Sequence, residues 1–124
     1  MSQRKEITQA FLKMAASGQV REAYEKFIAS DFIHHNQYFK GDRTSLMSAM
    51  EDASKQSPNK SFEVKKIYED GDTVISHGRV ERKNPGEAPI AVVHICRFKG
   101  DKIVEMWDCA QLIDKNSPNE NGLF

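Results

Sequence analysis

The chain has 124 residues, and its 18 basic and 18 acidic side chains give it no formal net charge. Single domains cluster at roughly 100–150 residues, so this length predicts one domain, residues 1–124. Without a basic excess we expect no nucleic-acid partner. The 39% hydrophobic content is enough for one core, which excludes wholesale disorder. No apolar run approaches the roughly 20 residues that a membrane helix needs, so we expect no membrane partner.

The N-terminal segment and the cysteines predict a cytoplasmic protein. The segment MSQRKEITQAF has no apolar signal core. Cys96 and Cys109 are too few for a disulfide scaffold and fit a reducing compartment. The sequence contains no Cys/His cluster with zinc spacing, no glycine-rich phosphate loop and no G-x-S-x-G elbow. We therefore expect neither a metal nor another cofactor.

The first half of the chain has the apolar spacing of helices. A first helix is predicted over about residues 3–16, with Gly18 as its stop. A second, short helix runs from Val20 and is predicted to end at Asp31, and residues 32–36 are expected to form a connecting loop. A third helix is predicted after Asp42, a good N-cap, and before the 57–59 segment that contains a proline.

From residue 61 the pattern changes to that of strands. Four strands are predicted over residues 61–69, 73–83, 90–98 and 103–113, with short turns between most of them. Short turns make consecutive strands antiparallel neighbours. Helices followed by hairpins predict an α+β fold, in which a curved antiparallel sheet wraps around the N-terminal helices. Such a cone leaves an opening where a small ligand could bind.

The register of the last hairpin decides which side chains share a face. A three-residue loop, 99–101, would place His94 opposite Met106 and put both on one apolar face with Asp108. A two-residue turn, 100–101, would place His94 opposite Trp107 and turn Asp108 to the other face. We favour the first register because it leaves one face clean for burial.

Asp108 and His94 are the candidate catalytic pair on that apolar face. Burial in apolar surroundings favours the neutral form of a carboxyl group, which moves it toward the working range of a general acid or base. His94 could share the proton or polarise a carbonyl. The alternative is structural: Asp108 as a hydrogen-bonded carboxylate and His94 as a satisfied core histidine.

Four further residues are candidate substrate-binding residues. Adjacent residues of an extended segment point to opposite sides, so of His34 and His35 we expect His35 to reach inward. His77 could point into the cone or outward with Arg79. Tyr24 is expected in the core, with its hydroxyl at the cavity wall. Met106 belongs to the same apolar face as His94.

Three stretches, residues 32–41, 69–77 and 93–111, together with the tail 116–124, resemble the SnoaL-like polyketide cyclases of the nuclear transport factor two-like superfamily. The resemblance implies a conical α+β barrel that forms a homodimer through the outer face of its sheet. It also implies ring closure by an intramolecular aldol condensation without metal or cofactor, with Asp108 as the acid/base and His94 as its helper. Met106 and Gln37 depart from the family pattern, which often has His and Pro at these positions.

Three functions follow as hypotheses. The first is a cyclase or isomerase acting on a small, apolar carbonyl substrate through Asp108. The second is a non-catalytic module that binds a small hydrophobic ligand in the same cone. The third is a dimerising interaction domain whose cone is filled by its own side chains.

Overall fold

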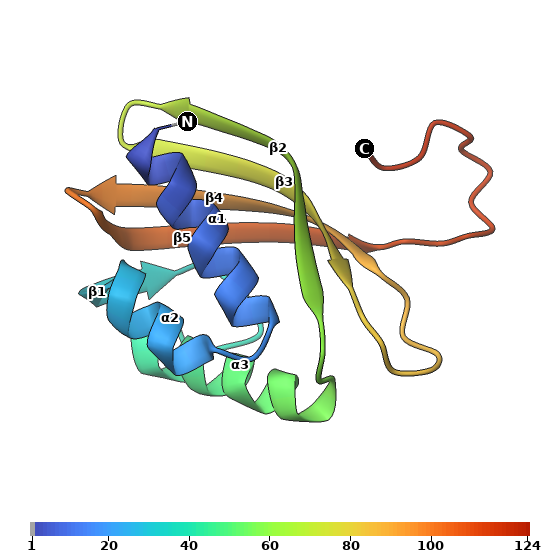
Figure 1. Ribbon diagram of the computed structural model, residues 1–124, viewed down its shortest axis with the longest axis horizontal. Helices are drawn as coiled ribbons and strands as arrows, with labels where there is room; N and C mark the ends of the chain where they lie inside the picture. Colours follow the sequence, from blue (N-terminus) through green and yellow to red (C-terminus); the bar gives the residue numbers. More distant parts are fainter. Residues whose placement is uncertain (1) are drawn as a thin grey trace.

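Residues 2–124 are described by a computed structural model, in which helices pack on one face of a single five-stranded sheet (Figure 1). The elements are, in chain order, α1 (Gln3–Ala16), α2 (Val20–Phe27), β1 (Ile28–His34), α3 (Arg43–Gln56), β2 (Ser61–Asp70), β3 (Thr73–Glu81), β4 (Ile90–Lys99) and β5 (Lys102–Leu112). The strand order is β1-β5-β4-β3-β2. The predicted α+β cone is confirmed. No helix in residues 2–124 is long and apolar enough to span a membrane.

Side-chain caps start two of the helices. The Ser2 hydroxyl accepts a hydrogen bond from the Lys5 amide at the beginning of α1, and the Asp42 carboxylate accepts one from the Ser45 amide at the beginning of α3. These bonds satisfy amides that have no partner inside the helix. The predicted start of the third helix after Asp42 is confirmed.

The segment predicted as a loop, residues 32–36, was partly misassigned. The second helix ends at Phe27, and β1 follows it directly as an edge strand parallel to β5. The pairing of β1 is irregular, with a register shift between Ile28 and Ile33, and its exposed Ser30 and Asp31 break the apolar alternation. A short, interrupted edge strand therefore gives almost no periodic signal.

The last hairpin has neither of the two registers considered from the sequence. Its turn is the two-residue one, with Lys99 paired to Lys102 and Gly100 at a φ of 62°. A β-bulge then places Ile103 and Val104 opposite Phe98, and beyond it Arg97 pairs with Glu105. The extra residue restores the alternation of faces that the longer loop would have produced. His94 consequently lies opposite Asp108, not opposite Met106.

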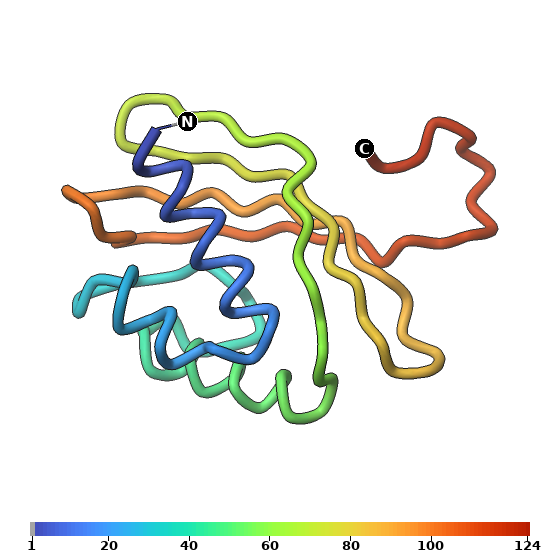
Figure 2. The backbone as a smooth tube through the Cα atoms, in the orientation of Figure 1, coloured from blue at the N-terminus to red at the C-terminus, as the bar shows by residue number. Residues whose placement is uncertain are grey.

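The core lies between the helices and the concave face of the sheet. Phe11 and Tyr24 are fully buried, and their rings meet edge to face with centroids 5.5 Å apart. In Figure 2, α1 crosses the concave face, β2 bends toward the end of α3, and β3 bends toward the hairpin 82–89. These bends open one end of the cone between the C-terminal ends of α1 and α3 and the beginning of β4.

The convex face of the sheet carries no helix (Figure 1). A row of apolar side chains crosses it at one level, formed by the paired residues Tyr68, Ile75, Ile95 and Trp107. The C-terminal tail returns over this side, where the Phe124 ring lies 5.0 Å from that of His77. The tail therefore does not cover the open end of the cone.

Candidate functional site

A cavity of about 430 Å³ occupies the open end of the cone. Its apolar wall combines Leu12 of α1, Met50 of α3, Phe62 of β2 and Ile90 of β4. Its polar lining residues are Ser54, Gln56, Ser57, Lys60, Arg82, Glu87 and His94. An apolar hollow with a few polar groups is typical of small-ligand sites. A cone filled by its own side chains, the third hypothesis, does not match this cavity.

His94 is held in the cavity wall by its neighbours on the sheet and by an aromatic ring. It lies between Ser76 of β3 and Asp108 of β5, and its ring centroid is 5.7 Å from that of Phe62. Neither ring nitrogen forms a hydrogen bond with a residue of the described chain, 2–124, and Nδ1 is fully buried. Burial lowers the pKa of His94 to about 4, and the charge of Asp108 opposes this shift only in part. The imidazole is therefore neutral at physiological pH.

Asp108 lies beside His94, but it is not part of the cavity wall. Its half-buried carboxylate accepts long hydrogen bonds from the Asn36 side-chain amide, at 3.4 Å to Oδ1 and 3.3 Å to Oδ2. The Asn36 carbonyl oxygen in turn accepts from the Tyr38 amide at 3.0 Å. The sequence analysis did not assign Asn36 a role, because nothing in the sequence indicates that the loop after β1 folds over β5.

Tyr24 is placed as predicted, in the core with its hydroxyl directed to a cavity residue. The hydroxyl donates to the sulfur of Met50 at 3.1 Å. Burial raises the pKa of Tyr24, so the phenol keeps its proton. The Arg43 guanidinium lies 5.6 Å above the Tyr24 ring and donates to the Tyr24 carbonyl oxygen at 3.2 Å. The phenol thus supports one wall of the cavity from behind.

The expectation that His35 reaches inward is wrong, and its neighbour does so instead. His34 is buried, with Nε2 2.7 Å from the Lys40 carbonyl oxygen. His35 is exposed and stacks flat on Trp107, with ring centroids 4.7 Å apart, while its Nε2 is 2.6 Å from the Glu105 carboxylate. The side chains of Glu105 and Trp107 lie on the convex face of the sheet. His35, which contacts both, therefore lies away from the cavity.

The other two candidate binding residues also lie outside the cavity wall. His77 takes the outward alternative, since it pairs with Val93 and Lys66 and contacts Phe124 of the tail. Met106 faces inward opposite Cys96, but it is buried within the core. Of the six candidate residues, the structure brings His94 and Asp108 together, with Tyr24 behind the cavity wall.

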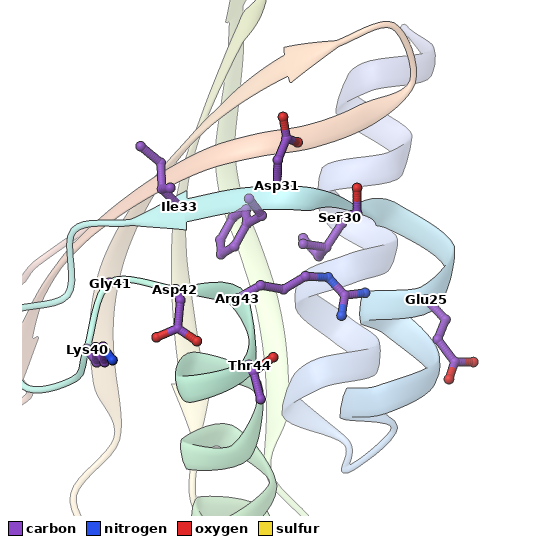
Figure 3. Close-up of a pocket in the computed structure, with 11 residues that line it drawn as sticks. Glu25, Ser30, Asp31, Ile33, Lys40, Gly41, Asp42, Arg43 and Thr44 are labelled. Atoms are coloured by element: carbon purple, nitrogen blue, oxygen red, sulfur yellow. The ribbon is translucent and has the colours of Figure 1, made fainter.

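A second, larger hollow of about 950 Å³ runs along the edge strand β1 (Figure 3). Its wall includes the charged residues Glu25, Asp31, Lys40, Asp42 and Arg43, and Figure 3 shows Arg43 reaching along it toward α2. This groove is open and contains none of the six candidate residues. No group of three or more His, Cys, Asp or Glu able to hold a metal ion occurs within residues 2–124.

Comparison with protein families decides the relationship of this chain. The model of the SnoaL-like domain family matches residues 8–106. The chain belongs to the SnoaL-like family. The resemblance seen in the sequence is thereby confirmed, and the match includes β1 through the first half of β5. No curated protein sequence matches the chain.

Solved structures share the fold of this SnoaL-like domain at low sequence identity. A candidate polyketide cyclase from Acidithiobacillus ferrooxidans is 19% identical, with a TM-score of 0.75 over 89% of both chains. IdmH, a candidate polyketide cyclase from Streptomyces antibioticus, is 18% identical, with a TM-score of 0.74 over 89% of this chain and 93% of its own. An NTF2-like protein of unknown function from Cytophaga hutchinsonii is 14% identical, with a TM-score of 0.68 over 87% and 89%. These likenesses establish the nuclear transport factor two-like fold.

The lowered pKa of His94 predicts how the stability of this SnoaL-like domain depends on pH. The pKa of His94 falls from its ordinary 6.5 to about 4 in the folded chain, so protonation favours unfolding. Its neutral form contributes stability that is complete above pH 6.5 and is lost as the pH falls toward 4. The loss is roughly 3 kcal/mol, since one pKa unit corresponds to about 1.4 kcal/mol.

Urea unfolding of the wild type and of His94→Gln between pH 4 and 7.5 measures this loss. We expect the difference in unfolding free energy between the two proteins to change in this pH range, with the wild type losing more on acidification. Parallel pH profiles would contradict the assignment of a neutral imidazole with a lowered pKa.

Proposed function

We propose that this SnoaL-like domain is a cofactor-independent cyclase or isomerase, in which Asp108 is the acid/base and His94 binds the carbonyl oxygen of a small apolar substrate. The observation that carries the proposal is the pairing of Asp108 on the concave face with His94, which lines the inner end of a mostly apolar cavity. Opposed side chains on neighbouring strands have Cβ atoms about 4.5–5.5 Å apart. A substrate seated on the imidazole is therefore within reach of the carboxylate.

The proposed reaction is an aldol-type ring closure. The Asp108 carboxylate removes a proton from the carbon next to a carbonyl, and the electron pair of that C–H bond forms an enolate. The enolate carbon attacks a second carbonyl carbon of the same molecule, which forms the new C–C bond and an alkoxide. The alkoxide then takes the proton back from Asp108, so the reaction needs no redox partner.

The neutral imidazole of His94 suits the role of a hydrogen-bond donor to the developing oxyanion. A donor aimed at the position where negative charge develops stabilises the transition state more than the ground state. Neither ring nitrogen is engaged by residues 2–124, so the imidazole is available to a substrate. The donor is also already in place, because Phe62 and the sheet hold the ring.

Hydrogen–deuterium exchange tests the proton-abstraction step without knowledge of the natural substrate. A panel of aryl alkyl ketones is incubated with the protein in D₂O, and deuterium at the carbon next to the carbonyl is followed by NMR. We expect wild-type protein to accelerate exchange for the ketones that bind. Ketones that bind without accelerated exchange would favour the non-catalytic ligand-binding module.

We further propose a homodimer that forms through the convex face of the sheet. The row of Tyr68, Ile75, Ile95 and Trp107 supports it, because no helix covers this face and Tyr68 is 57% exposed. Sedimentation measures the association, and Ile95→Asp is expected to yield a monomer because it buries an unpaired charge at the interface. A wild-type monomer at high micromolar concentration would contradict this proposal.

A further inference from the structure

The polar end of the cavity carries two cations at the same level of the sheet. Ser61 pairs with Glu81, so Lys60 and Arg82 are neighbours just outside the ends of β2 and β3. Both line the cavity, together with Glu87 of the following hairpin. His94 lines it from deeper in the sheet. The cavity thus has a cationic outer end and a neutral imidazole at its inner end.

The one acidic residue of this outer end is already engaged. Glu87 Oε1 accepts a hydrogen bond from the Ser57 hydroxyl at 2.6 Å, and Oε2 is 3.4 Å from Nη1 of Arg82. Arg82 also donates through Nε to the Ala88 carbonyl oxygen at 2.7 Å. Glu87 and Arg82 therefore largely neutralise each other, and the charge of Lys60 is left in excess.

The ammonium group of Lys60 forms neither a hydrogen bond nor an ion pair with any residue from 2 to 124, although Glu87 attracts it at longer range. Burial lowers the pKa of Lys60, an effect that attraction by Glu87 opposes and repulsion by Arg82 increases. Placing a cation in partly buried surroundings without a partner costs free energy. A bound anion would offset that cost.

We propose that the ligand of this cavity is an amphipathic keto acid, whose carboxylate binds Lys60 at the outer end while its carbonyl group reaches His94. This inference rests on the proposed function for the carbonyl end, and it adds the anionic group. The apolar body of the ligand would lie against Leu12, Met50 and Phe62, which line the cavity between the two polar ends.

The register of the sheet sets the length of such a ligand. Ser76 of β3 pairs with His94, and Arg82 lies six positions further along the same chain. At about 3.3 Å per residue, the backbone levels of the two ends are at most roughly 20 Å apart. The long side chains of Lys60 and Arg82 shorten this separation. Even so, only an extended ligand can bridge the two ends.

Calorimetric titration with 7-benzoylheptanoate and its methyl ester tests the inference, because the two probes differ only in the charged end. The aryl ketone is designed for His94 and the carboxylate for Lys60. We expect the acid to bind about tenfold more tightly than the ester, which corresponds to 1.4 kcal/mol. The shorter 3-benzoylpropionate cannot reach both ends and is expected to show no preference over its ester.

Two lysine variants test whether Lys60 causes the tighter binding of the acid. Lys60→Met keeps the apolar length of the side chain and is expected to abolish the preference for the acid without weakening the ester. Lys66→Met removes the same charge from the same strand, at a position paired with the outward-facing His77, and is expected to leave the preference intact.

The outcomes separate this inference from the proposed function. Equal binding of acid and ester to the wild type would overturn the keto-acid assignment while leaving the carbonyl site in place. An equal loss of the preference for the acid in both lysine variants would mean that the preference comes from net charge. That result would also overturn the keto-acid assignment. Failure of both probes to bind would overturn the carbonyl site and the keto-acid assignment together.

Discussion

Asp108→Asn is expected to lower the rate of α-proton exchange in bound ketones by about 10²–10⁴-fold, the usual contribution of a general base. The amide has nearly the same shape as the carboxylate but cannot accept the proton. Its carbonyl oxygen can still accept from the side chain of Asn36, whose contacts at 3.3 and 3.4 Å are long in the wild type. Ligand affinity and melting temperature should therefore change little.

The control for this variant is Asp101→Asn, which removes a carboxylate from the exposed turn of the same hairpin. It should exchange ketone protons at the wild-type rate. If Asp108→Asn retained the wild-type rate on a ketone that binds, then the base would have to be another group. His94→Gln would be the next variant to measure, since the imidazole lines the cavity and lies opposite Asp108.

Gly78→Ala is expected to destabilise the fold by about 1–3 kcal/mol, the usual cost of overpacking a filled site. A Cβ atom at this position would lie 2.6 Å from Cε1 and 2.7 Å from Cζ of the Phe62 ring, and 2.8 Å from the Glu63 carbonyl oxygen. Phe62 lines the cavity and packs against His94, so its displacement also changes the ligand site. Denaturant unfolding and titration with a neutral ketone measure the two effects.

Gly41→Ala provides the matched control for this glycine. Its added Cβ would meet only the His34 carbonyl oxygen, at 3.6 Å, an ordinary contact distance. The unfolding free energy of the control should lie within about 0.5 kcal/mol of that of the wild type, as is usual for surface substitutions. Equal stability of the two variants would mean that Phe62 is free to move away from Gly78.

The fold was largely predictable because most of its elements have strong periodic signals. The helix after Asp42 and the four hairpin strands are marked by caps, turns and alternation within a few residues of their ends. β1 was not predictable in this way, because its partner β5 lies about seventy residues later in the chain and its own alternation is interrupted at Ser30 and Asp31. Tertiary pairing, not local preference, makes it a strand.

The candidate site was predictable only where a polar residue interrupts an apolar face. That signal identified His94 and Asp108, and it failed for His34 and His35. Adjacent His34 and His35 had to point to opposite sides, but the side was set by the parallel pairing with β5. Lys60, Ser54 and Asn36 carry no signal at all, because it is the packing of α3 and the loop after β1 that brings them to the cavity or to Asp108.

The bulge at Val104 decides which side chains of β5 face the interior, because it shifts the pairing of all later residues by one position. A regular ladder continued from the same turn, with Val104 kept and no bulge, would pair His94 with Trp107 and turn Asp108 to the convex side. A one-residue insertion or deletion in β5 that the bulge does not absorb would therefore add or remove the interior carboxylate while the turn and the strand order persist. Acid–base chemistry in such a sheet is as easily abandoned as acquired.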